Sequence, residues 1–455
     1  MSSLWANATK VWTSDSGSAG VVFIAVRNDS LGENGESLPD TVYAVKGSSR
    51  IAQESFATSL GALIPGLRFP TMRLVQFTEP EWGEIKNLLN EQLACMYASN
   101  STAEEVSAAY AIRQKLVELD RPFFHVMDFV PGAPLMCNYN TGAYFNTYRG
   151  AGTGRSTVSD ESFGHTLGKI IAFDIFINNS DRIPTSVHDN EGNASNLMLQ
   201  PKTNDTVAIS TPTQGCVVVA IDTCVATIDP VKQRKMLEFY IHRVHMFLER
   251  VHDTTTPVAV SLRQVREFLQ NETCHESSDT DLMDIISGVR AGVQSILTVL
   301  TKDILRAELE NLRAMVAPNK DWEGVWAKSV DLVSLDSLYA LYDCFDQYRG
   351  WEGGSGRAGA QVELSSASTS TSVSVSLATT AAAAVNGAGM ADRVEVANLL
   401  LLQMHPARSG KLLGDEIASQ LHASAEKGPS NRLRGAPGRM PGLVCWSAAQ
   451  RTKWE

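Results

Sequence analysis

Residues 163–222 form the stretch that most restricts how this chain can fold. The stretch begins with an apolar segment long enough for a helix that is covered on most sides, and its large side chains are Leu167, Ile170, Ile171, Phe173, Ile175, Phe176 and Ile177. The polar run Asn-Asn-Ser-Asp-Arg follows at residues 178–182, and Pro184 prevents the helix from continuing. A buried helix that ends in this way delivers the charged side chains behind it, including Asp181, to a fixed place.

Two more polar residues in this stretch adjoin apolar segments. Asn196 begins the sequence NLML, and Asp222 follows the β-branched run VVVAI, which predicts a strand. Carboxylate and amide oxygens are suitable ligands for a divalent metal, and a carboxylate can also orient an acceptor hydroxyl. The stretch therefore indicates a site that holds a metal ion and a transferable phosphate.

The composition is that of a soluble globular protein with a substantial core. The 455 residues give room for about two to three domains, and 44% of them are hydrophobic while 20% are charged. The net charge of -11 is uneven, because residues 1–350 contain 29 Lys and Arg against 42 Asp and Glu. General nucleic-acid binding by this acidic body is not expected.

The cysteine pattern and the hydropathy exclude other classes. The seven cysteines are scattered and include no C-x-x-C pair, so neither a disulfide scaffold nor a zinc site is indicated. The first residues lack an apolar stretch of signal-peptide length, and no run approaches the roughly 18 to 20 apolar residues of a membrane span. We therefore expect a reducing, cytoplasmic setting and no membrane span.

The first 50 residues predict a small β-rich unit with a Ser/Gly hairpin at residues 12–20. Ser16, Gly17 and Ser18 lie at its tip, where several backbone N–H groups could approach an anion because no bulky side chain blocks them. An ordinary turn without a ligand is the alternative.

A lysine closes the next predicted strand, TVYAVK. Lys46 is followed by a segment, IAQESFATSLGALI, that predicts a short amphipathic helix carrying Glu54. The carboxylate of Glu54 could pair with the ammonium of Lys46 and hold it toward a phosphate. The alternatives are a solvated strand end for Lys46 and an exposed helical charge for Glu54.

The rest of the sequence predicts a helical body followed by a low-complexity tail. Residues 123–135, an apolar strand stopped by a Pro-Gly turn, could connect two lobes and offer backbone groups to a flat heterocycle. GAGTGR at residues 150–155 is no dinucleotide fingerprint because no βαβ unit surrounds it. The low-complexity sequence after residue 350 predicts disorder, and its basic end suits either an acidic partner or solvent. Helices are predicted at 81–98, 103–119, 230–315 and 321–350, and a strand at 67–77.

Seven segments together resemble the catalytic domain of the actin-fragmin kinases. This family of atypical protein kinases is distantly similar to the phosphatidylinositol kinases and to the ordinary protein kinases. The resemblance covers about residues 10–300, and its segments are WTSDSGSAGVVF, VYAVKGSS, GLRFPTMRL, VMDFVPG, FDIFINNSDRIP, NEGNASNLML and VVAIDTCV.

The resemblance implies an α+β, two-lobed protein-kinase-like fold. It implies a catalytic domain at 1–350, with a β-rich N-lobe at about 1–130 and a mainly helical C-lobe at about 131–350, before a disordered tail at 351–455. The implied activity is an ATP- and Mg²⁺-dependent serine/threonine protein kinase. The implied partner is actin, or a complex of actin with a severing protein, and the implied location is the cytoplasm with its cytoskeleton.

The resemblance also implies a role for each site residue. Lys46 would contact the α/β-phosphates, and Glu54 would orient it. Asp181 would be the catalytic base, Asn196 would hold a metal, and Asp222 would be the principal Mg²⁺ ligand. The phosphates would be covered by Ser16, Gly17 and Ser18, and the hinge beside the nucleotide would be formed by Met127, Asp128, Phe129 and Val130.

The chain departs from the ordinary protein kinases at several places. Asp181 and Asn196 are 15 residues apart instead of five, and the insertion also offers Asn190 and Asn193 as metal ligands. The motifs D-F-G and A-P-E are absent from the sequence, and G-x-G-x-x-G is absent from residues 1–350. Nothing after residue 350 resembles the kelch repeats that the family's type member carries. A lipid or small-molecule kinase, and a non-catalytic scaffold with the same fold, are the alternative functions.

Overall fold

The structure is a computed structural model that describes residues 4–13, 20–28, 39–97, 102–135, 161–188, 190–201, 216–273, 275–316 and 323–350. The chain divides into two units, Met1–Ala360 and Gln361–Glu455, and every described residue belongs to the first. The predicted hairpin tip with Ser16, Gly17 and Ser18, the segment at 150–155 and the tail at 351–455 lie outside the described residues. The predicted domain limits stay predictions.

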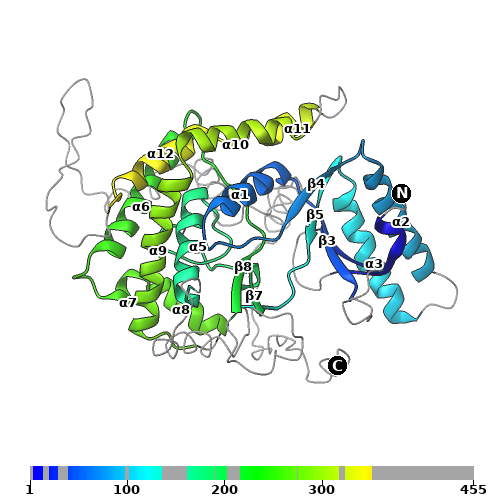
Figure 1. Cartoon of the computed structure of the whole chain (residues 1–455), viewed down its shortest axis with the longest axis horizontal. Coiled ribbons are helices and arrows are strands. Elements are labelled where there is room, and N and C mark those ends of the chain that lie inside the picture. The colour runs from blue at the N-terminus through cyan, green and yellow to red at the C-terminus, as the bar shows by residue number, and fades with distance from the viewer. Residues whose placement is uncertain are drawn as a thin grey trace, which may run out of the picture. The chain divides into compact units, whose positions relative to one another are not determined.

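The N-terminal part is built on a five-stranded antiparallel sheet with the order β1-β2-β3-β5-β4 (Figure 1). In this sheet Phe23 pairs with Ala44, and Lys46 pairs with His125. Side chains of residues that pair directly across two strands point to the same face of the sheet, so Lys46 and His125 lie on one face. The strands are β1 (Ala8–Thr13), β2 (Gly20–Val26), β3 (Thr41–Gly47), β4 (Met72–Gln76) and β5 (Phe123–Asp128).

The opposite face of the sheet packs on two helices, α2 (Pro80–Met96) and α3 (Ala103–Leu119). Val22 and Val45 of the strands share one hydrophobic core with Leu89 of α2 and Ile112 of α3. The two helices match those predicted at 81–98 and 103–119.

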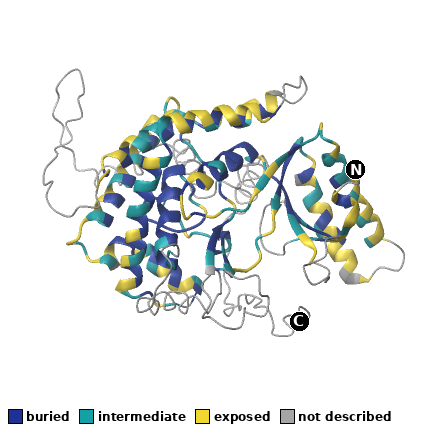
Figure 2. Cartoon of the chain, in the orientation of Figure 1, coloured by how far each residue is buried: buried dark blue, intermediate teal, exposed yellow. Residues whose placement is uncertain are grey.

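Helix α1 (Ile51–Leu63) differs from the amphipathic helix that was expected. It packs between β5 and two later helices, α10 (Lys302–Ala314) and α11 (Glu323–Val330), and ten of its residues are buried (Figure 2). Its polar residues Gln53 and Thr58 are buried as well. The helix itself is confirmed, and only its expected exposed polar face is wrong, because a single sequence does not show that later helices cover that face.

The predicted strand at 123–135 is interrupted. Strand β5 ends at Asp128, and the short β6 (Ala133–Pro134) belongs to a second, three-stranded sheet with β7 (Leu197–Pro201) and β8 (Cys216–Ala220). Gly132 lies at the break with φ +143°, and a Cβ atom there would meet the carbonyl oxygen of Leu199. Glycine suits this backbone conformation and this close approach.

The C-terminal part is helical, and its centre is the buried helix α5 (Phe163–Ile177), as the sequence predicted (Figures 1 and 2). Helix α9 (Asp279–Val299) packs along α5. Among the described helices, α9 alone has the length and the apolar composition to cross a membrane. Half of its most apolar 18-residue segment is buried inside the protein, as in the core helix of a globular domain. The remaining helices are α6 (Arg234–His252), α7 (Val258–Ser261), α8 (Arg263–Thr273) and α12 (Leu335–Asp346). This α+β architecture, with a β-rich N-terminal and a helical C-terminal part, confirms the predicted fold class.

Glycines let α5 and α9 approach each other closely. A Cβ atom on Gly168 would lie 2.6 Å from the backbone nitrogen of Val289, and one on Gly288 would lie 2.7 Å from the carbonyl carbon of His165. Real Cβ atoms are not found at such distances, so an alanine at either position would force the helices apart.

We expect Gly288→Ala to lower the free energy of unfolding by about 1–3 kcal/mol, because overpacking outweighs the helix propensity that alanine gains. Gly83→Ala is the matched control. Gly83 lies in α2, and outside its own helical turn no described residue comes within 4 Å of the place that a Cβ atom would occupy. The control should raise stability by up to about 1 kcal/mol. Urea unfolding of both variants tests this, and equal stabilities would contradict the close packing.

Candidate active site

The side chains of Lys46, Glu54 and Asp222 meet between the two parts of the protein. Lys46 lies at the end of β3, Glu54 in the first turn of α1, and Asp222 two residues after β8. The Nζ atom of Lys46 is 3.0 Å from Oε2 of Glu54 and also contacts Oδ1 of Asp222. Lys46 and Glu54 are buried. The alternatives of a solvated strand end and an exposed helical charge are therefore wrong.

The electrostatics keep Lys46 and Glu54 ionised. Burial alone would lower the pKa of Lys46, but the carboxylates of Glu54 and Asp222 outweigh it and raise the pKa above its ordinary value. Burial acts against the charge of Glu54 too, yet the ammonium of Lys46, with His125 and Ser48, lowers the pKa of Glu54 to about 2. Both groups are charged at neutral pH, as a phosphate-binding lysine and its partner require.

Asp222 is held in an uncommon backbone conformation. Its φ is +56°, in the left-handed region that few residues other than glycine adopt. The side chain of Asp222 is 38% exposed, so it faces open space as well as Lys46. Strained backbone of this kind clusters at functional sites.

Asp181 and Asn196 form a second pair beside this cluster. The Nδ2 group of Asn196 donates to the backbone oxygen of Asp181 at 2.9 Å and to its Oδ2 at 3.2 Å. The backbone N–H of Ile221 donates to the carbonyl oxygen of Asn196 at 3.0 Å, which places Asp222 next to the pair. Partial burial of its carboxylate, followed by the charge of Asp222, raises the pKa of Asp181.

The segment between Asp181 and Asn196 forms a loop that is held together by hydrogen bonds within it. The N–H of Asn193 donates to the carbonyl of Arg182 at 2.9 Å, and the amide of Asn190 donates to the carbonyl of Ser180. The Oδ1 of Asn193 accepts from the N–H of Ser195 at 3.2 Å. Asn190 and Asn193 thus bond to the loop itself, whereas Asn196 bonds to Asp181.

A buried ion pair that the sequence reasoning missed supports this loop. The guanidinium of Arg182 is fully buried and contacts Oδ1 of Asp174 on α5. It also donates to the carbonyl of Ile221 at 2.9 Å and to Oγ1 of Thr223 at 2.6 Å. The pair therefore ties α5 to both sides of Asp222. The sequence signal that could have revealed this ion pair is Asp174, an acidic residue in the middle of an apolar helix.

The predicted hinge residues lie where β5 leaves the sheet. The N–H groups of Asp128 and Phe129 donate to the carbonyls of Thr71 and Val42, at 3.0 and 3.1 Å. Met127 pairs with Ala44 within the sheet, and Val130 follows the strand. Phe129 is 39% exposed. The edge of its ring meets the ring of Phe23, which stacks on Trp12, so flat apolar surface lies next to the hinge.

The donor set around Lys46 fits a hard cation. Carboxylate oxygens of Asp222 and the Oδ1 of Asn196 are oxygen donors, which Mg²⁺ prefers. Across the described ranges no group of three or more His, Cys, Asp or Glu side chains could hold a metal ion. Magnesium in kinases is held by one or two protein side chains together with the phosphates of its nucleotide, so the residues present fit it.

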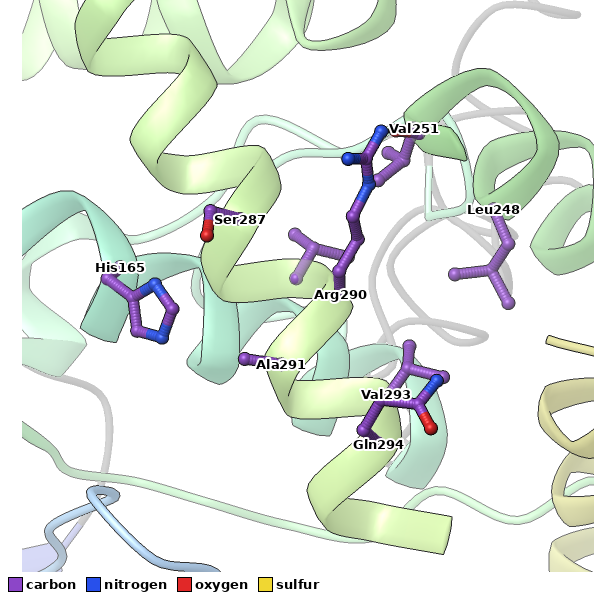
Figure 3. Close-up of a pocket in the computed structure, with 9 residues that line it drawn as sticks. His165, Leu248, Val251, Ser287, Arg290, Ala291, Val293 and Gln294 are labelled. Atoms are coloured by element: carbon purple, nitrogen blue, oxygen red, sulfur yellow. Dashed lines mark hydrogen bonds between the residues drawn. The ribbon is translucent and has the colours of Figure 1, made fainter. Parts of the chain in front are cut away.

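A surface cavity of about 300 Å³ lies elsewhere, between α5, α6 and α9 (Figure 3). His165 of α5, Val251 of α6 and Arg290 of α9 line it, and none of the predicted site residues does. One guanidinium nitrogen of Arg290 is bonded to the carbonyl of Val251 at 2.7 Å. The cavity is therefore separate from the cluster around Lys46.

The fold and this cluster define a class. The β-rich part presents a buried Lys–Glu pair, and the other part presents two aspartates and an asparagine beside it. This is the arrangement of a protein-kinase-like protein.

Comparison with known proteins gives the family. The family model described as the catalytic domain of actin-fragmin kinase matches residues 3–293, well over half of the chain. The chain belongs to this family, and it is a kinase by class.

Individual relatives are distant. One Dictyostelium discoideum protein, named provisionally as an actin-fragmin kinase, is 24% identical over 73% of this chain and 71% of its own length. A second with the same provisional name is 23% identical over 64% of this chain and 59% of its own length. A dual specificity protein phosphatase of Arabidopsis thaliana, PHS1, is 26% identical over 40% of this chain and 18% of its own length.

Proposed function

We propose that this protein is an ATP- and Mg²⁺-dependent protein kinase that transfers the γ-phosphate to a serine or threonine hydroxyl. The observation that carries the proposal is the buried Lys46–Glu54 pair in contact with Asp222, beside the pair of Asp181 and Asn196. Phosphoryl transfer depends mainly on positioning and on neutralising charge, and this cluster supplies groups for both.

Each residue has a role in this proposal. When bound, Mg-ATP supplies the transferable phosphoryl group and a cation that neutralises phosphate charge. Lys46 binds the α/β-phosphates, and Glu54 keeps its ammonium in place. Asp222 and Asn196 are the residues that would hold the metal. Asp181 orients the acceptor hydroxyl and accepts its proton, and its raised pKa suits a proton acceptor better than an ordinary aspartate. Met127, Asp128, Phe129 and Val130 would bind the adenine at the hinge.

The proposed acceptor is actin, alone or in complex with a severing protein. The support for it is the name of the family and of the Dictyostelium relatives. A cytoplasmic protein that acts at the cytoskeleton follows from an actin substrate and is part of the same proposal.

The test is transfer of labelled γ-phosphate by the full chain with Mg²⁺, offered free actin, actin capped by a severing protein, and phosphoinositide vesicles in parallel. We expect label on serine or threonine of actin, and none with Asp222→Asn. Label on the lipid would replace the proposal by a lipid kinase. ATP binding without label on any acceptor would indicate a scaffold.

A further inference from the structure

His125 is a fully buried histidine at the centre of the N-terminal part. It lies on β5, paired with Lys46 of β3, and its side chain is 0% exposed. Its ring reaches two consecutive residues of α1. The Nε2 atom is 2.7 Å from Oγ of Ser55, and the Nδ1 atom is 3.7 Å from Oε2 of Glu54. A polar ring buried in this way needs a partner, and the hydrogen-bond partner of its Nε2 atom is Ser55 on α1.

The hydrogen bonds of Ser55 fix the direction of the first contact. The hydroxyl of Ser55 donates to the carbonyl of Ile51 at 2.9 Å, and a hydroxyl has one proton to donate. Ser55 Oγ therefore accepts the hydrogen bond from Nε2–H of His125. This chain of bonds joins β5 to the backbone of the first turn of α1, and it leaves Nδ1 as the ring atom that faces Glu54.

The carboxylate of Glu54 is held directly by Lys46 and Ser48, and His125 acts on it through the first turn of α1. Its Oε1 atom accepts from the hydroxyl of Ser48 at 2.7 Å, and its Oε2 atom lies between Lys46 and His125. A rotation of the carboxylate would lose more than one of these contacts.

We infer that His125 is a positioning residue that fixes the first turn of α1 through Ser55, and so keeps Glu54 and the ammonium of Lys46 in the orientation that phosphoryl transfer needs. This inference rests on the proposed function. His125 touches none of the reacting groups, so it acts on the reaction only through Glu54. A small misplacement of a phosphate-binding group slows phosphoryl transfer strongly. The loss of His125 should therefore lower the rate even though His125 is remote from the reacting groups.

A double-mutant cycle tests the inference with His125→Phe, which keeps a buried ring without nitrogens, and Glu54→Gln. We expect each single variant to lower kcat/KM by about 10- to 100-fold, mainly through kcat. The double variant should be no slower than Glu54→Gln, because the two residues act in series. Losses that multiply in the double variant would overturn the inference, since a merely structural role of His125 would not depend on Glu54.

Ser55→Ala is a second test of the inference, because it removes the hydrogen-bond partner of His125 and leaves the ring in place. It should lower kcat/KM in the wild-type background and change nothing in the Glu54→Gln background. Phe124→Leu is the control for general loosening, because Phe124 is the neighbour on β5 that faces the opposite core. It should lower thermal stability with little effect on kcat.

A failure of the proposed function is distinguishable from a failure of this inference. If the wild-type chain labels no acceptor, the proposed function fails, and the same cycle is measured on the dissociation constant of Mg-ATP. Non-additive losses of affinity would then support the role of His125 in holding Lys46. Additive losses, in either readout, would overturn it.

Discussion

Asp222→Asn is expected to lower phosphoryl transfer by about 10³-fold or more while leaving the protein folded. Asparagine is nearly isosteric with aspartate and is among the few residues that tolerate the left-handed conformation at φ +56°. The backbone at this position should therefore stay as it is. What is lost is the negative charge, which in the proposed function holds the metal and also contacts Lys46.

The measurement is labelled phosphate transfer, together with the thermal shift that Mg-ATP produces. The variant should show the melting temperature of the wild type without nucleotide and a smaller shift with Mg-ATP. Asp229→Asn is the matched control, because Asp229 follows on the same segment and its Oδ1 accepts from the N–H groups of Val231 and Lys232. An asparagine can keep these bonds, so transfer should be unchanged. Wild-type transfer by Asp222→Asn would remove Asp222 from the metal site.

The sequence predicted the elements of the site well where local pattern determines them. The apolar run before Asp181 predicts a buried helix, and α5 is buried along its length. The pattern placed Lys46 at the end of a strand and Glu54 on the following helix and left their pairing as one of two alternatives, and Nζ of Lys46 lies 3.0 Å from Oε2 of Glu54. These predictions depend on one element and its immediate neighbours, which is the range over which hydrophobic periodicity and turn residues carry information.

The features that the sequence did not reveal depend on contacts between distant segments. Helix α1 is covered by α10 and α11, about 250 residues later in the chain, so its polar residues gave a misleading amphipathic pattern. His125 meets Ser55 only because β5 pairs with β3. A single sequence does not state which strands pair or which helices cover each other, and these contacts decide burial.

The buried pair of Asp174 and Arg182 is the clearest of these hidden features. Asp174 lies on α5, and its Oδ1 atom also accepts from Nδ2 of Asn179 at 2.9 Å. Arg182 follows Asp181 directly and bonds to the carbonyl of Ile221, which precedes Asp222. The guanidinium thus joins the two loops that carry the aspartates of the site. Its planar, five-donor fork suits this role in a way that a lysine would not.

Asp174→Asn is expected to lower the free energy of unfolding by about 3–5 kcal/mol, because it leaves the charge of Arg182 buried without its counterion. The side chain of Arg182 is 0% exposed, so solvent cannot compensate. Urea unfolding measures the loss. The matched control is Glu238→Gln, which breaks the exposed pair with Arg234 and should change stability little. Similar losses in both variants would contradict the buried pair as a support of the fold.

A third variant separates the cost of the unpaired charge from the loss of the connection. Asp174→Leu combined with Arg182→Met removes both charges and keeps apolar volume, so it should regain part of the stability that Asp174→Asn loses. It should not regain transfer, because the carbonyl of Ile221 and the hydroxyl of Thr223 lose the donor that holds them beside Asp222. Recovered stability with impaired transfer would show that the pair positions the two aspartate loops. Recovery of both would show that these loops hold their geometry without Arg182.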